Sequence, residues 1–217
     1  MRWLHLTVLG MALVGQAHGE NIIDVLRRSQ HQRLDALKPA QDAQRAQKVR
    51  ATFDKLTQAL KPAVAVEFRV VSGPIIAETL HGDIIVANES LADLPEGERA
   101  FIIAHELGHV SESHWAQLGR VYLRWVPGEV TQDKTDPVAG ALGRDASALA
   151  HRHEYAADAF ALHTLAGFGW SVDVALAAFL RQGVQHDSAT HPATRKRIAA
   201  LRAAHAGTSL AAVEDAK

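Results

Sequence analysis

Residues 105–109 read His-Glu-Leu-Gly-His, and they directly follow the apolar run Phe-Ile-Ile-Ala at residues 101–104. Positions four apart lie on one face of a helix, so His105 and His109 can present two imidazoles to one metal ion. Glu106 is then placed to reach a water molecule held at that metal. The pattern therefore predicts a zinc hydrolase with Glu106 as its general base.

A catalytic zinc ion needs a third protein ligand. The chain contains no cysteine, so this ligand must be His, Asp or Glu. The extended pattern HExxHxxGxxH fails, because Glu112 and Trp115 stand where Gly and His are required. Glu154 is the better candidate, since it lies on a predicted alanine-rich helix together with Asp158, one turn later. Asp158 can accept a hydrogen bond from the distal N–H of a zinc-bound histidine, although such a pair also occurs on solvated helix faces.

Several separated motifs resemble those of the HtpX-like and CAAX-prenyl-protease-like zinc metallopeptidases. The nearest in kind is the soluble periplasmic, BepA- and LoiP-like branch. The resemblance spans roughly residues 50–201. Its motifs are Gly82-Asp83-Ile84-Ile85-Val86 with Leu91 and Leu94, His105-Glu106-Leu107-Gly108-His109-Val110 with His114, His153-Glu154-Tyr155-Ala156-Ala157-Asp158, and Thr190-His191-Pro192 with Arg197-Ile198.

The resemblance implies a gluzincin-type fold in which two motif helices face each other across a zinc ion. The implied ligands are His105, His109 and Glu154. It also places His191 and Arg197 near the site, as candidates to stabilise the oxyanion of the tetrahedral intermediate. Three other interpretations stay open: His191 caps a helix, His191 is a fourth zinc ligand, or Arg197 is an ion-pair partner around Asp158 and Glu154.

The hydrophobic pattern predicts an α+β domain that is mainly helical, with a small antiparallel sheet. Turn residues separate the expected strands, and Pro, Gly or Ser residues delimit the expected helices. The expected strands are residues 64–71, 75–80 and 84–87. The expected helices are residues 21–37, 40–60, 95–114 with a continuation over 115–125, 138–165, 171–182 and 192–204, and a polar loop is expected over 127–137.

The N-terminus has the pattern of a secretory signal. Arg2 precedes a largely apolar stretch, and Ala17-His18-Gly19 offers small residues for cleavage before Glu20. We therefore expect a signal peptide over 1–19, a metallopeptidase domain over 20–206 and a disordered tail over 207–217. Export of a cysteine-free chain suits a bacterial periplasm. The alternative is an uncleaved N-terminus that anchors the protein to a membrane.

The formal charge of −1 gives no electrostatic reason to expect nucleic acid as a partner. The expected substrates are polypeptides, above all unfolded or misassembled chains, bound as an extended strand beside an edge strand, residues 84–87. The expected role is envelope protein quality control, and peripheral membrane association is compatible with it. The alternative is a zinc-occupied, chaperone-like binding protein with little turnover. The sequence does not indicate an oligomeric state.

Overall fold

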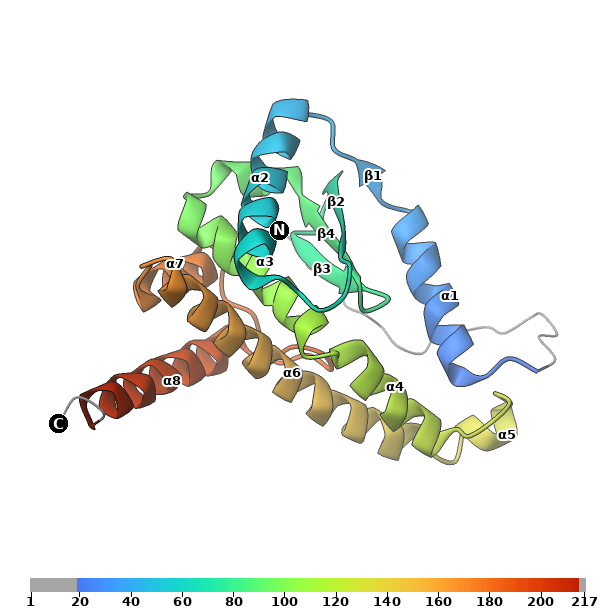
Figure 1. Cartoon of the computed structure of the whole chain (residues 1–217). Helices are drawn as coiled ribbons and strands as arrows, with labels where there is room; N and C mark the ends of the chain where they lie inside the picture. The colour runs from blue at the N-terminus through green and yellow to red at the C-terminus, as the bar shows by residue number, and fades with distance from the viewer. Residues whose placement is uncertain (1–18, 215–217) are drawn as a thin grey trace.

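Helices surround one small sheet in this structure, a computed structural model that describes residues 19–214 (Figure 1). The predicted signal peptide, apart from Gly19, lies outside the described residues. The helices and strands confirm the prediction of a mainly helical α+β domain. They are α1 (Ile22–Asp35), β1 (Lys38–Pro39), α2 (Ala43–Leu60), β2 (Glu67–Ser72), β3 (Ala77–Leu80), β4 (Ile84–Asn88), the 3-10 helix η1 (Glu89–Asp93), α3 (Glu96–Ser111), α4 (His114–Trp125), α5 (Gln132–Thr135), α6 (Ala139–Gly167), α7 (Val172–Gln182) and α8 (Thr194–Glu214).

The sheet is mixed, and the prediction of an antiparallel sheet is wrong. Its strand order is β1-β2-β4-β3, and β2 pairs with β4 in parallel, while the other two pairs are antiparallel. The physical reason lies in β4, whose residues are almost all buried, as in a strand covered on both faces. This strand takes the inner position. The more polar β3, with Glu78 and Thr79, is left at the edge.

The β3–β4 hairpin turns through two residues in the left-handed region, His81 at φ 55° and Gly82 at φ 90°. A Cβ added at Gly82 would lie 3.0 Å from the Cβ of Trp115 on α4. Glycine is therefore required here both by the backbone conformation and by the packing of the turn against α4.

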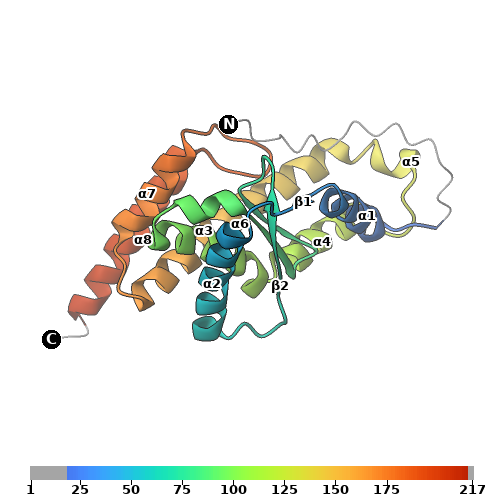
Figure 2. The same cartoon turned by 90° about the horizontal axis from the view of Figure 1, so that it is seen from above.

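Helix α3 runs through the middle of the molecule, between α2 and the sheet on one side and α6 on the other (Figures 1 and 2). Nearly all of its residues from Gly97 to Val110 are buried. A helix buried around its whole circumference belongs to the core of a domain, although this one also buries polar residues such as Arg99 and Glu106. Glu96 and Glu98 occupy its first turn, where negative charge interacts favourably with the helix dipole. The centre of the domain therefore carries the His-Glu-x-x-His motif.

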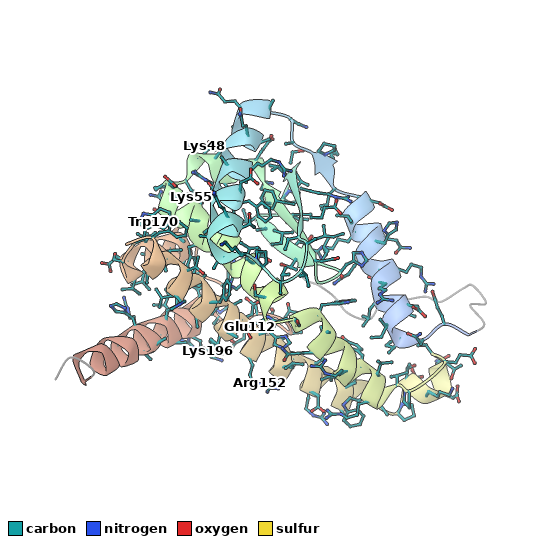
Figure 3. All side chains as sticks on the ribbon, in the orientation of Figure 1. Lys48, Lys55, Glu112, Arg152, Trp170 and Lys196 are labelled. Carbon is teal, nitrogen blue, oxygen red and sulfur yellow. The ribbon has the colours of Figure 1, made fainter. Side chains whose placement is uncertain are left out.

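The outer helices are attached to this centre by contacts that include cation–π pairs. The Nζ atom of Lys55 on α2 lies 5.2 Å from the ring centroids of both Phe168 and Trp170, which lie between α6 and α7. Lys55 and Trp170 are neighbours in Figure 3. Lys55 also donates a hydrogen bond to Glu96 at the start of α3. These contacts connect α2 with both α3 and the α6–α7 junction.

Two segments differ from the sequence-based expectation. Helix α8 continues to Glu214, through residues for which a disordered tail is predicted. This segment carries Ala211 and Ala212, which favour a helix, beside Gly207, Thr208 and Ser209, which do not. The expected polar loop over 127–137 contains the short helix α5. No helix among residues 19–214 is long and apolar enough to cross a membrane.

Candidate metal centre

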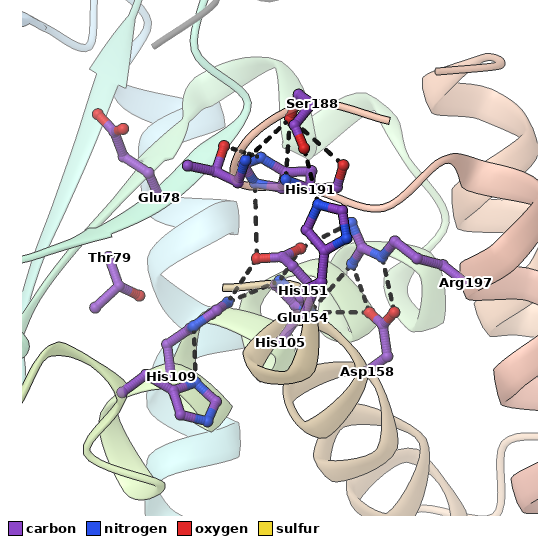
Figure 4. A network of polar contacts seen from close by, with 12 residues as sticks. Glu78, Thr79, His105, His109, His151, Glu154, Asp158, Ser188, His191 and Arg197 are labelled. Atoms are coloured by element: carbon purple, nitrogen blue, oxygen red, sulfur yellow. Dashed lines mark hydrogen bonds and ion pairs between the residues drawn. The ribbon is translucent and has the colours of Figure 1, made fainter. Parts of the chain in front are cut away.

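Three side chains from α3 and α6 converge as a possible metal site (Figure 4). One ligand atom from each of His105, His109 and Glu154 lies within 4.8 Å of the other two. The Nε2 atoms of the two histidines are 3.1 Å apart, and His109 Nε2 is 3.3 Å from Glu154 Oε1. The Nε2 atom of His105 is 3.6 Å from Glu154 Oε2. The structure thus brings the three predicted ligands together.

The close approach of α3 and α6 depends on Gly108, inside the motif. A Cβ added at this position would lie 3.1 Å from the Cα of Ala157 and 3.2 Å from the Cβ of Phe160. Both atoms are fixed to the α6 backbone, so they can yield only if the helix moves. Gly108 therefore allows the two helices to pack closely enough for their ligands to share one ion.

Asp158 orients His105 through Nδ1, the ring nitrogen that does not face the other two candidate ligands. The distance between His105 Nδ1 and Asp158 Oδ1 is 2.9 Å, so the imidazole donates its Nδ1–H and keeps the Nε2 lone pair for a metal. Burial disfavours the charged imidazole, but the hydrogen bond to Asp158 and the charge of Glu154 outweigh it and raise the pKa of His105 above its ordinary value. Asp158 thus lies where the sequence predicts a supporting carboxylate.

Arg197 from α8 contacts two carboxylates of α6, those of Glu154 and Asp158. Its Nε and Nη2 atoms donate to the two oxygens of Asp158 at 2.8 and 2.6 Å, and its Nη1 lies 3.0 Å from Glu154 Oε2. Burial opposes ionisation of Glu154, but the charge of Arg197 and the hydrogen bond with His109 hold the pKa of Glu154 well below its ordinary value. The same two effects, burial opposed by Arg197, leave the pKa of Asp158 lowered. This geometry favours the ion-pair interpretation of Arg197.

The donor set fits a divalent cation. Glu154 is an ionised carboxylate with a side chain only 6% exposed, and it faces two imidazole nitrogens. Its buried Oε2 atom lies against Arg197 as an ion pair but accepts no hydrogen bond. A buried charged oxygen without a full set of partners is costly, and a cation would complete them. Two imidazoles and one carboxylate are also a common ligand set of catalytic zinc sites.

Glu106 lies beside this group and is held by a residue that sequence reasoning missed. The hydroxyl of Thr79 on β3 lies 2.7 Å from Glu106 Oε2 and 3.1 Å from the Glu106 carbonyl oxygen, and it can donate to either. Glu106 also lines a cleft together with residues of β3, α3, α7 and the loop before α8. Within its own segment, nothing distinguishes Thr79 from any other strand threonine.

His191 approaches the centre from the loop between α7 and α8. Its Nε2 atom is 3.6 Å from Glu154 Oε1, and its side chain is 45% exposed. Its Nδ1 atom is 2.8 Å from the hydroxyl of Thr190. The loop is fixed by Ser188, whose backbone N–H donates to the His191 carbonyl and whose own carbonyl accepts from His151 Nε2. Burial lowers the pKa of His191, so the ring is neutral near pH 7.

Two further histidines lie behind His109. His114 Nδ1 is 2.9 Å from His109 Nδ1, and the ring of His114 stacks on that of His153 with centroids 3.9 Å apart. Burial, followed by the charge of His109, lowers the pKa of His114 to about 3. Burial likewise lowers the pKa of His153 to about 4. Both side chains are buried.

The comparisons with known proteins agree with this geometry. No curated protein matches the chain. The family model described as peptidase family M48 matches residues 39–205, well over half of the chain, and this match includes both motif helices and the loop that carries His191. With a His-His-Glu group positioned to hold a metal ion, the chain belongs to peptidase family M48, a family of metallopeptidases.

Proposed function

We propose that this protein is a zinc-dependent endopeptidase. The observation that carries the proposal is the convergence of His105, His109 and Glu154, with Glu106 next to the first ligand and facing the same cleft. A purely structural metal site has no need of a neighbouring general base. A set of three protein ligands also leaves a coordination position for substrate or water, as catalytic zinc sites do.

The residues of the chain supply the proton transfers. A zinc ion at this site would polarise the scissile carbonyl and make an attacking water molecule more acidic. Glu106 takes a proton from that water as its oxygen bonds to the carbonyl carbon, and passes the proton to the leaving amine as the C–N bond breaks. Thr79 holds one carboxylate oxygen of Glu106 and leaves the other for this exchange.

The oxyanion that forms on the carbonyl needs a hydrogen-bond donor besides the metal. His191 is placed for this task, because it is partly exposed and its Nε2 atom faces the ligand group. Its ring donates from Nε2 when the Thr190 hydroxyl donates to Nδ1. Arg197 is already engaged with Asp158 and Glu154, so its contribution to catalysis is to fix the ligands.

The substrate would bind as an extended segment along β3. The predicted edge strand, residues 84–87, is wrong, because β4 has neighbours on both sides and β3 forms this edge of the sheet. Ala77 of β3 lines the cleft, and Thr79 contacts the proposed base. Backbone pairing at an edge tolerates many side chains, so unfolded or misassembled polypeptides are the proposed substrates.

The proposed setting is protein quality control in a bacterial periplasm. Its support is the signal-like pattern of residues 1–19 and the lack of cysteine in an exported chain. An uncleaved N-terminus that anchors the protein is the alternative, and peripheral membrane association is compatible with both. The near-neutral formal charge favours polypeptide over nucleic acid as the partner.

One observation supports a second candidate function, a zinc-occupied binding protein with little turnover. His191 Nε2 lies 3.6 Å from Glu154 Oε1, near enough to join the ligand group. If Nδ1–H donates to Thr190, the Nε2 lone pair is free to bind a metal. Four protein ligands would then close the site, as in structural zinc centres.

Casein hydrolysis and metal content test these proposals together. Wild type should contain about one zinc ion per chain and cleave casein. Glu106→Gln should keep the metal and lose activity, whereas Glu154→Ala should lose both. Equal activity of wild type and Glu106→Gln would remove the peptidase mechanism. Stoichiometric zinc without turnover in wild type would favour the closed site, and His191→Ala should then release activity.

A further inference from the structure

A row of three imidazoles extends from the metal centre into the protein. His109 contributes the first ring. His114 Nδ1 lies 2.9 Å from His109 Nδ1, with ring centroids 4.9 Å apart and ring planes at 77°. The third ring, His153 of α6, lies nearly parallel to His114 at 12°. His114 and His153 are 5% and 7% exposed, so solvent does not determine their orientation.

The backbone is bent to place His114 in this position. Helix α3 ends at Ser111, and α4 begins at His114 itself. Between them, Ser113 adopts the left-handed conformation at φ 54° and ψ 40°, which is unfavourable for a residue other than glycine. The break between α3 and α4 thus brings the ring of His114 to His109, next to the ligand helix.

The contact between His109 and His114 fixes where their protons lie. The Nε2 atom of His109 faces His105 and Glu154, so metal binding requires the lone pair of that nitrogen. A neutral imidazole carries one N–H, and His109 must then carry it on Nδ1. At 2.9 Å, His114 Nδ1 must accept that hydrogen, which places the His114 proton on Nε2.

The third ring is itself held in place. Its Nε2 atom is 3.2 Å from Gln117 Oε1, which can only accept, so His153 donates there. The Gln117 amide nitrogen in turn donates to the carbonyl of Glu112 at 2.7 Å. The side chain of Gln117 is thereby oriented by the backbone at the end of α3. The stacked ring of His153 therefore determines the plane in which His114 Nδ1 can accept a hydrogen bond from His109.

We propose that His114 is a positioning residue for the metal, which fixes His109 as an Nε2 ligand just as Asp158 fixes His105. The role rests on the proposed metal-binding function. The neutral imidazole of His114 supports His109, whereas the charged carboxylate of Asp158 supports His105. Hydrogen-bond partners of this kind typically contribute 10–100-fold in metal affinity.

Two substitutions separate the hydrogen bond from packing. His114→Phe keeps a ring but removes the acceptor, and His114→Asn keeps an acceptor oxygen. His163→Phe, at an exposed histidine on α6, is the matched control. The Kd for Zn²⁺ is measured by competition with a chromophoric chelator, beside the unfolding midpoint of each metal-free variant. We expect His114→Phe to raise Kd about 10–100-fold, His114→Asn to recover part of this loss, and His163→Phe to change nothing.

A spectroscopic measurement on the unaltered protein covers the case in which His114→Phe does not fold. Long-range proton–nitrogen correlation spectra of the Zn²⁺-loaded protein report the tautomer of each histidine. His109 should carry its proton on Nδ1 and His114 on Nε2. A His114 ring protonated on Nδ1, or a folded His114→Phe that binds Zn²⁺ as tightly as wild type, would overturn this role alone. Failure of wild type to bind Zn²⁺ would overturn the proposed zinc site together with it.

Discussion

His105 and Asp158 are joined by a hydrogen bond of 2.9 Å between Nδ1 and Oδ1, although one lies on α3 and the other on α6. The same carboxylate receives two hydrogen bonds from Arg197 of α8. One buried side chain, 2% exposed, thus connects a candidate metal ligand to the C-terminal helix. Metal binding and the stability of the fold should therefore depend on the same charge.

Asp158→Asn tests this dependence. The substitution preserves the size of the side chain but leaves the buried Arg197 without its main counter-ion, and removing one partner of a buried pair typically costs about 3–5 kcal/mol. Urea unfolding of the metal-free protein should show a loss of this order, and Zn²⁺ affinity should fall about 10–100-fold. Asp173→Asn, at an exposed position on α7, should change stability by less than about 1 kcal/mol. Similar effects of the two substitutions would contradict the proposed coupling.

The contribution of Asp158 should also depend on pH. Burial opposes its ionisation, but Arg197 outweighs burial and keeps the folded-state pKa of Asp158 below its ordinary value. A lowered carboxylate pKa stabilises the fold above the unfolded-state pKa, and this contribution is lost as pH falls through the folded-state value. The difference in unfolding free energy between wild type and Asp158→Asn should be constant above about pH 5 and shrink below about pH 4. A difference in unfolding free energy that grows as the pH falls would contradict this prediction.

Gly108 should be irreplaceable for a steric reason. Alanine usually stabilises a helix interior by about 1 kcal/mol relative to glycine, but a Cβ here would lie 3.1 Å from the Ala157 Cα. Gly108→Ala should therefore push α3 and α6 apart, lower the unfolding temperature and weaken Zn²⁺ binding. Gly143→Ala on α6, where an added Cβ meets no atom within 4 Å, should leave metal binding unchanged and be neutral or stabilising. Equal Zn²⁺ affinity in both variants would show that close helix packing is not needed.

The candidate ligand group could be predicted from the sequence because helical spacing pairs its residues, and because the family resemblance implied Glu154 as the third ligand. His105 and His109 are four residues apart, as are Glu154 and Asp158, and each pair lies on one helix. The edge strand could not be predicted in this way. Local alternation and turns indicate that strands exist, but the burial of β4 on both faces, a property of the whole fold, decides that β3 is at the edge.

The contacts that sequence reasoning missed join residues without a fixed spacing. Thr79 precedes Glu106 by 27 residues and sits on another element. Its contact exists only because β3 is the strand that lies along α3. His114 lies close in sequence to His109, but the left-handed conformation of Ser113 brings their rings together, and serine carries no strong signal for that conformation. Such contacts can be identified only once the arrangement of the helices and strands in space is known.

Thr79 provides the most direct test of how the proposed base is positioned. Its hydroxyl is 2.7 Å from Glu106 Oε2, and a hydrogen bond to a charged group contributes about 1.5–3 kcal/mol. Thr79→Val keeps the β-branched shape that suits a strand but removes the donor. If the bond acts in the transition state, kcat should fall about 10–100-fold with KM and zinc content unchanged.

Thr79→Ser is the matched control, because serine retains a hydroxyl at the same carbon and loses only a methyl group. We expect its kcat to lie within a few-fold of wild type. The hydroxyl can also donate to the Glu106 carbonyl at 3.1 Å, in which case it would stabilise the contact between β3 and α3. Thr79→Val would then lower the unfolding temperature and zinc content along with kcat. A selective loss of kcat, restored by serine, therefore distinguishes orientation of the carboxylate from support of the fold.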